Sequence, residues 1–166
     1  MTEEKTEAAE SQEQAAKNQF ALQRIYLKDV SFESPMGINA RSNAKPALTQ
    51  DLHTKVDKVG DNHYEVVLHL TITVKQEENV MFLVEVHQAG LFFISGLNTE
   101  QVKQVVSSTC PSILFPYARE TVDSLAVRGG FQPLMLPPVN FEGLYAKSIA
   151  DAKKAEEQAG ASTEVH

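Results

Sequence analysis

The sequence has little positive charge and almost no cysteine, and both shortages exclude classes of protein. Its 15 lysines and arginines stand against 22 aspartates and glutamates, which gives a net charge of −7. This balance argues against binding to nucleic acid or to an anionic membrane, because both require basic patches. A single cysteine forms no internal disulfide and fits a reducing cytoplasm. No early segment resembles a signal peptide and no apolar run could span a bilayer, so we expect a cytoplasmic protein without membrane insertion.

Motifs for catalysis are also missing. The chain has no glycine-rich phosphate loop and no Gly-x-Ser-x-Gly element. Four histidines are predicted to lie on strand surfaces, without the spacing of metal ligands: His53, His63, His69 and His87. Cys110 is interpreted as a packed structural thiol, because a free cysteine usually behaves as a small hydrophobe. We predict no catalytic residue, no metal and no cofactor, although missing motifs alone leave an uncharacterised enzyme open.

The composition divides the chain into one domain and two tails. At 166 residues, a single domain with a real core is expected. Residues 1–19 are rich in Glu, Ala and Gln with few large apolar side chains, and we predict a disordered N-terminal arm. Residues 156–166 are small and polar and are predicted to be a disordered tail. The folded domain should therefore span residues 20–155.

Alternating apolar and polar residues predict four strands joined by short turns. The clearest alternation runs from Tyr64 to Val74, and weaker patterns cover 20–33, 48–56 and 80–88. In the first pattern the apolar residues change phase near Lys28 and Asp29. Either a bulge re-aims the strand there or both of its faces are partly covered. Short turns between the strands predict an antiparallel meander.

The reverse face of this sheet is expected to mix acids with an apolar residue. In the second phase of the first strand, Asp29 and Glu33 lie opposite to the apolar residues. In the last strand, Leu83 and Glu85 lie on the face away from the core. A face of this kind suits a weak contact surface as well as plain solvent.

Two helical regions follow the strands. Asn98 with Gln101 resembles a capping box for a short helix that ends before Cys110. A longer helix should run from 111 to 127, kinked or restarted at Pro116, with Gly129 as the left-handed residue that stops it. Asn140 should cap a last helix with an apolar stripe.

Between these helices, residues 131–139 are apolar but cannot be helical. Pro133, Pro137 and Pro138 remove backbone donors and keep the chain extended. Such a loop must be covered, either by the protein's own core or by apolar segments of another chain lying between loop and last helix. The residues proposed for that client groove are Phe131, Leu134, Met135, Phe141, Leu144 and Tyr145. The predicted fold is α+β: a four-stranded antiparallel meander with a long helix and a C-terminal helix on one side, joined by this loop.

Five runs of the sequence resemble the SecB family, export chaperones of Gram-negative bacteria. They are QRIYLKDVSFE (23–33), YEVVL (64–68), ILFPYARE (113–120), RG (128–129) and PVNF (138–141). They follow the family's order across most of the chain, with a slight departure in proline placement around Gln132.

The resemblance implies a function and partners. SecB proteins are homotetramers, dimers of dimers, that bind unfolded secretory precursors, keep them unfolded and deliver them to the SecA motor without a cofactor. The acidic sheet face of the family receives the zinc-bearing tail of SecA, and the matching residues here are Asp29, Glu33, Leu83 and Glu85. A SecB-like chaperone dedicated to one unstable partner, such as an antitoxin, is the alternative.

Overall fold

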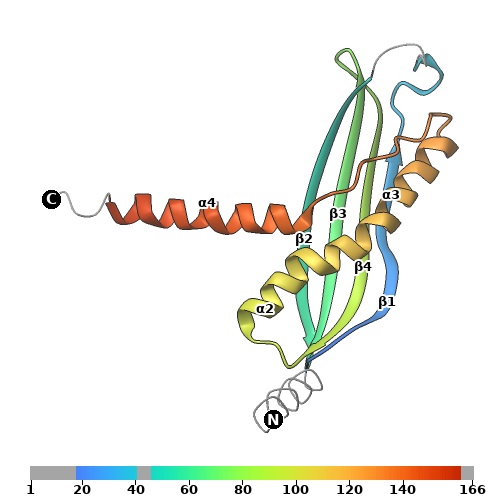
Figure 1. Cartoon of the computed structure of the whole chain (residues 1–166). Coiled ribbons are helices and arrows are strands. Elements are labelled where there is room, and N and C mark those ends of the chain that lie inside the picture. Colours follow the sequence, from blue (N-terminus) through green and yellow to red (C-terminus); the bar gives the residue numbers. More distant parts are fainter. Residues whose placement is uncertain (1–17, 41–45, 162–166) are drawn as a thin grey trace, which may run out of the picture.

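The computed structural model describes residues 18–40 and 46–161, with side chains as far as residue 155. Most of the predicted arm and the end of the predicted tail lie outside these residues. The elements in chain order are β1 (Gln19–Glu33), η1 (Gly37–Asn39), β2 (Ala47–Gly60), β3 (His63–Gln76), β4 (Asn79–Ser95), α2 (Thr99–Gln104), η2 (Val105–Thr109), α3 (Cys110–Arg128) and α4 (Phe141–Ala161). One sheet carries the helices on a single face, and α4 extends away from the sheet (Figure 1).

The predicted α+β fold with a four-stranded antiparallel sheet is confirmed. The strand order is β1-β4-β3-β2, so β2, β3 and β4 form the meander. β1 pairs with the free edge of β4 rather than with β2. A simple four-stranded meander would have left β4 as an edge strand, whereas β1 here satisfies its exposed backbone groups.

Of the two alternatives for the phase change in β1, a bulge is present. The pairing of β1 with β4 shifts between Leu27 and Asp29, and a second shift occurs between Leu22 and Arg24. A one-residue shift reverses the faces of all residues beyond it. Val30 therefore joins Leu27 on the helix-bearing face, and Asp29 takes the outer face.

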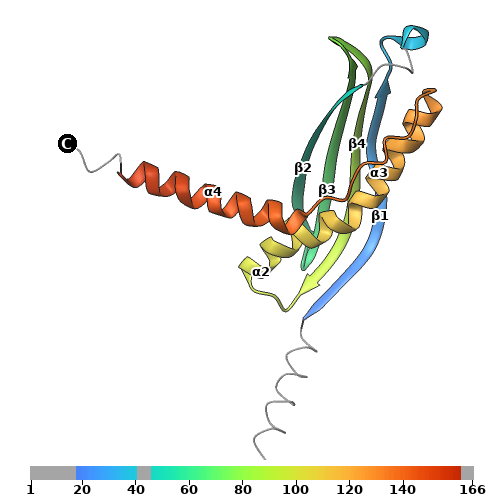
Figure 2. The ribbon, with the colours of Figure 1, turned by 45° about the horizontal axis from the view of Figure 1, so that its top comes forward.

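The helices on the inner face form one continuous segment rather than two. The predicted capping box is present, since Asn98 Oδ1 accepts from Gln101 N at 2.9 Å and Gln101 Oε1 accepts from Asn98 N at 3.0 Å. The expected end before Cys110 is wrong, because α2 continues through the π-helical turn η2 into α3 (Figure 2). The wider π turn ends at Thr109, two residues before Pro111, whose ring would crowd the preceding carbonyls of a regular α-helix. Pro116 lies inside α3 without ending it.

α3 ends one residue later than predicted. Gly130, with φ 84°, is the left-handed residue, whereas Gly129 keeps a right-handed helical conformation. Phe131 N donates to Ala126 O at 2.9 Å and Gly130 N donates to Val127 O at 3.0 Å. This pair of bonds is the Schellman arrangement. It turns the chain so that Phe131 points back onto the sheet.

The core lies between the inner face of the sheet and α3. Fully buried residues of β3 and β4 meet Leu114, Ala118 and Val122 of α3. α4 begins at the predicted cap, where Asn140 Oδ1 accepts from Gly143 N at 2.9 Å. Phe141, at its start, is the part of α4 that joins the core. Among the helices of residues 18–40 and 46–161, none is long and apolar enough to cross a membrane.

Candidate binding surfaces

The four residues predicted for the outer face lie together. In the register of β1 with β4, Glu33 is opposite Leu83 and Ser31 is opposite Glu85. Asp29 lies one step further along the same face. The side chains of Asp29 and Glu85 are 72% and 47% exposed, so both carboxylates are open to a partner. We call Asp29, Glu33, Leu83 and Glu85 the acidic surface. Its halves meet only because β1 lies beside β4.

A histidine of β4 contacts this surface. His87 lies opposite Asp29, its Nε2 is 2.9 Å from Glu85 Oε1, and its Nδ1 is 3.9 Å from Asp29 Oδ2. His69 of β3 lies opposite His87, and His53 of β2 lies opposite His69. Their ring centroids are 3.9 Å and 4.3 Å apart. We call His53, His69 and His87 the histidine row.

The sequence analysis placed these histidines in separate strands but missed the row. A signal was available. His53 and His69 are equally far from the turn at Asp61, and His69 and His87 are equally far from the turn at Glu78. Residues at equal distances from a tight turn face each other in a hairpin. Within the described residues, no group of three or more His, Cys, Asp or Glu side chains is arranged to hold a metal ion.

Further along the outer face, an acid is neutralised by its neighbours. Glu65 accepts a hydrogen bond from the Tyr26 hydroxyl, and its Oε2 lies 2.5 Å from Lys28 Nζ. The bonds from Lys28 and then Tyr26 lower the pKa of Glu65. Burial, followed by the bond to Glu65, raises the pKa of Tyr26 to about 12. Glu65, whose side chain is 14% exposed, is therefore not an open carboxylate like those of Asp29 and Glu85.

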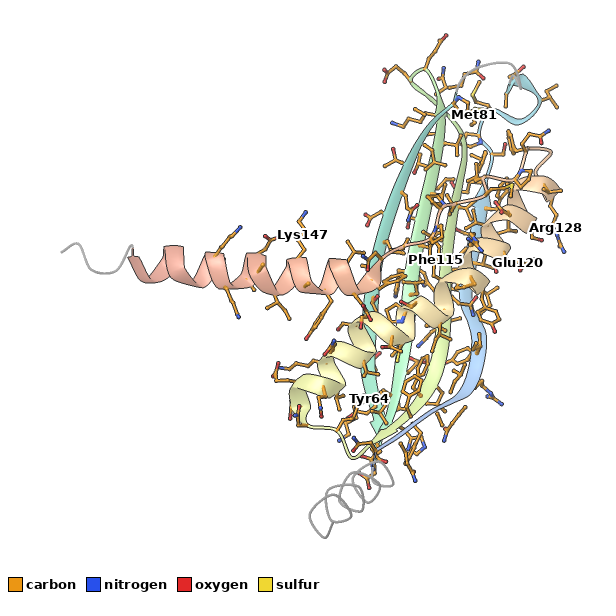
Figure 3. The ribbon with its side chains drawn as sticks, in the orientation of Figure 1. Tyr64, Met81, Phe115, Glu120, Arg128 and Lys147 are labelled. Carbon is orange, nitrogen blue, oxygen red and sulfur yellow. The ribbon has the colours of Figure 1, made fainter. Side chains whose placement is uncertain are left out.

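An apolar groove of about 530 Å³ lies on the opposite side, at the end of the sheet. We call it the end groove. Met81, which Figure 3 places at this end, and Phe82 form its floor. Phe131 packs on Phe82 with ring centroids 4.5 Å apart. The groove is lined by Gly37, Ile38, Ala40, Pro46, Val74, Met81, Phe82, Gly129, Gly130, Phe131, Gln132, Pro133 and Leu134.

The six residues predicted for the client groove do not lie together, and two of them line the end groove. Phe131 and Leu134 line the end groove. Met135, 76% exposed, lies beside a second groove between the loop and α3. Phe141 is 4% exposed and packs against Phe115, so it supports the loop from beneath. Leu144 and Tyr145 lie on α4, which extends away. The end groove is therefore closed by η1 and the sheet, not by α4.

The loop that lines the groove is fastened to α3. Asp123 Oδ1 accepts from Leu134 N at 2.8 Å and from Met135 N at 3.1 Å. Arg119 Nη1 donates to Leu136 O at 3.3 Å. These bonds supply backbone partners that the prolines prevent the loop from making itself. They hold Leu134 at the groove and Leu136 in the core.

A stripe of apolar residues on β1 lies uncovered beside the helix layer. These side chains share the inner face of the sheet but lie beyond the reach of α3, with exposures of 38–45%. We call them the edge stripe: Phe20, Leu22, Leu27 and Val30. Contiguous apolar surface of this kind marks an interaction site.

The fold and these surfaces define a protein that presents open surfaces to other chains: an apolar groove on one side of a sheet and an acidic patch on the other. Residues 12–152 match the family model of SecB, preprotein translocase subunit SecB. The chain is 51% identical over 158 residues to the protein-export protein SecB of Saccharophagus degradans, which covers 92% of this chain and 94% of that protein. The protein-export protein SecB of Chromohalobacter salexigens is 47% identical over 163 residues, with coverages of 96% and 99%. The chain belongs to the SecB family.

The predicted family is thereby confirmed, and with it the predicted role as a chaperone in protein export. A SecB-like chaperone from Mycobacterium tuberculosis, solved in complex with a ChAD peptide from an antitoxin, aligns with a TM-score of 0.63. It is 18% identical and covers 77% of this chain and 95% of that chain. At this identity the likeness shows a shared fold.

Proposed function

We propose that this protein works in the cytoplasm as a homotetramer that holds unfolded secretory precursors and delivers them to SecA. The observation that carries the proposal is the separation of two surfaces. The end groove lies on the helix-bearing side of the sheet, and the acidic surface lies on the outer side. A client and a motor can therefore contact the same subunit at the same time.

The end groove suits clients that share no sequence. Its lining combines the rings of Phe82 and Phe131 with flexible Met81 and the exposed side chain of Ile38. Such a surface can re-pack around different apolar side chains, whereas fixed hydrogen bonds would select one sequence. Burying one large client side chain is worth roughly 1.5–3 kcal/mol before ordering costs. A single groove therefore binds weakly.

Several subunits on one long client would overcome this weakness. After the first contact, each later contact is intramolecular, and avidity rises by about 10² or more. Affinity should then depend on the length and unfoldedness of the client. The edge stripe supports the proposed assembly, because it leaves apolar side chains of β1 exposed in an isolated chain.

The acidic surface suits the basic, zinc-stabilised tail of SecA. The exposed carboxylates of Asp29 and Glu85 attract a basic segment, and the half-buried Leu83, opposite Glu33 and next to Glu85 on this face, offers an apolar contact. Attraction of this type acts over about 8 Å at physiological salt.

The test is formation of a ternary complex of the full chain, an unfolded precursor and purified SecA, measured by analytical ultracentrifugation. We expect precursor and SecA to bind together without competition. Competition between them would contradict the separation of the two surfaces. Binding of a single dedicated partner, with no affinity for precursors in general, would favour the antitoxin-type alternative. SecB is a chaperone family, and the absence of catalysis stays a prediction for this chain.

A further inference from the structure

The histidine row runs straight into the acidic surface. Its three rings occupy directly opposed positions on β2, β3 and β4, and the next position, on β1, is Asp29. The row and the acidic surface thus form one continuous polar strip across the outer face of the sheet. A change of charge in the row acts directly on the carboxylates.

His87 is the point of contact. Its side chain is 20% exposed and lies between Glu85, at 2.9 Å, and Asp29, at 3.9 Å. A proton added to this ring would therefore lie between two negatively charged carboxylates. Imidazole is the side chain that ordinarily changes its charge between about pH 5 and pH 8. Protonation there would cancel part of the negative charge that the acidic surface presents.

The groups around His69, the middle ring of the row, disfavour a proton on that ring. Burial, followed by the neighbouring His87 and His53, lowers the pKa of His69. Glu85 opposes that effect and Lys55 of β2 adds to it. Lys55 is itself paired with Asp57, with Nζ and Oδ2 3.0 Å apart. Since adjacent rings at this distance repel each other when both are charged, the middle ring stays neutral beside a charged neighbour.

The remaining neighbours on this face are polar or acidic. Thr71 of β3 lies opposite Glu85, and Asp51 of β2 lies opposite Thr71. Neither supplies a positive charge. Lys28, the residue before Asp29 on β1, is positively charged but is paired with Glu65. The row is therefore the group next to Asp29 and Glu85 whose charge can change near neutral pH, with Lys55 beyond it.

We propose that the histidine row sets the charge of the acidic surface, so that docking of a basic partner segment weakens as the pH falls from about 7.5 to about 5.5. The inference rests on the proposed docking of SecA at this surface. The sign follows from charge alone, because a proton on His87 repels a basic segment. One exposed charge pair changes an equilibrium by up to about fivefold. Since His87 lies beside two carboxylates, we expect a loss of about three- to tenfold.

The experiment measures the affinity of the full-length chain for purified SecA at about pH 7.5 and about pH 5.5, at constant ionic strength. His87→Gln keeps a side chain that can hydrogen-bond to Glu85 but cannot become charged. We expect wild-type affinity to fall at the lower pH and that of H87Q to change much less. Any titration of SecA itself affects both proteins equally, so the difference between them isolates the row. If H87Q does not fold, His87→Asn serves the same purpose.

His63→Gln is the matched control. His63 is on the same face but at the far end of β3, where it contacts Gln23 and the backbone of Asp61. H63Q should keep the pH dependence of the wild type. Equal pH dependence in wild type and H87Q would overturn the inference. Glu85→Lys, measured at about pH 7.5, distinguishes a wrong docking surface from a wrong role of the histidine row. If E85K also binds SecA normally, the docking surface itself is wrong. If E85K binds SecA more weakly but H87Q keeps the pH dependence of the wild type, only the role of the row is wrong.

Discussion

At the scale of single residues, the packing around Gly129 leaves no room for a side chain. A methyl group built there would lie 2.3 Å from Phe32 Cζ. Phe32 packs in turn on Phe82 and Phe131, with centroids 5.8 Å and 6.4 Å away. The ring has little room to move, so the absence of a side chain at Gly129 lets α3 end against β1.

We therefore predict that Gly129→Ala destabilises the protein by about 1–3 kcal/mol, the usual range for overpacking. Gly60→Ala is the matched control, because its added methyl group would meet His63 at an ordinary 3.7 Å. Urea unfolding of both variants measures the difference. An unfolding midpoint for G129A equal to that of the wild type would contradict the packing described here.

Cys110 should be inert in the folded protein. It is fully buried, and burial raises its pKa from 9.0 to about 12. This difference lowers the thiolate fraction near neutral pH by about 1000-fold, and the thiolate is the reactive form. We predict that a disulfide reagent labels Cys110 at least that much more slowly in the native protein than in denaturant. Rapid native labelling would show that the thiol is accessible.

The same pKa shift gives a direction for stability at high pH. A thiol whose folded pKa is raised stabilises the fold fully below its unfolded pKa, and loses that contribution as the pH rises toward its folded value of about 12. Stability should therefore fall in alkaline solution, and less steeply in Cys110→Ala, as measured by urea midpoints. If the urea midpoints of the wild type and C110A fall equally steeply with pH, Cys110 does not cause the loss of stability.

At the scale of elements, the sequence pattern predicted those features that depend on side chains close together in the chain. The strands, the bulge before Asp29 and the caps at Asn98 and Asn140 all follow from side chains within a few residues of each other. The pairing of β1 with β4 could not be predicted this way, because a period of two says which face a residue takes but not which strand lies beside it.

The same distinction applies to the two candidate binding surfaces. The acidic surface depends on strand phase, so its four residues could be assigned correctly to one face. The end groove depends on how η1, the sheet and the loop meet, and on the direction in which α4 leaves Asn140. Sequence spacing contains neither, so it could not predict that Ile38 and Phe82 line the end groove or that Phe141 is buried.

The loop beside α3 gives a prediction at this scale. Asp123→Ala removes the acceptor of two backbone donors, those of Leu134 and Met135. Losing a hydrogen bond of this kind costs about 0.5–1.5 kcal/mol, and the loop loses its fixed position. We expect faster amide hydrogen exchange at Leu134 and Met135 and weaker holding of precursors.

Two controls make this test specific. Asp123→Asn retains an acceptor oxygen and should have a smaller effect. Glu120→Ala, on the exposed side of the same helix, should leave exchange in the loop unchanged. If D123A and E120A exchange alike, Asp123 does not hold the loop.

At the scale of the whole molecule, the edge stripe requires cover. Four apolar side chains of β1 remain 38–45% exposed, and α3 exposes Tyr117 and Val127 as well. We predict a tetramer at micromolar concentration, and we expect Leu27→Glu to dissociate it, because a charge would enter an apolar contact. Light scattering that gives a monomeric mass for the wild type would contradict the assembly.

Two surfaces on opposite sides of one sheet are the central claim about function, and paired variants test it most directly. Ile38→Gln alters the end groove at a fully exposed position, so folding should be unaffected. Glu85→Lys reverses one charge of the acidic surface.

The decisive measurement is the affinity of each variant for an unfolded precursor and for SecA, both determined by calorimetry on the full-length chain. I38Q should weaken precursor binding by about three- to tenfold, since a polar side chain replaces an apolar contact, and leave SecA binding unchanged. E85K should weaken SecA binding by a similar factor, more at low salt, and leave precursor binding unchanged. If either variant weakens both partners equally, or if neither variant weakens its own partner, the separation of client and motor surfaces is wrong.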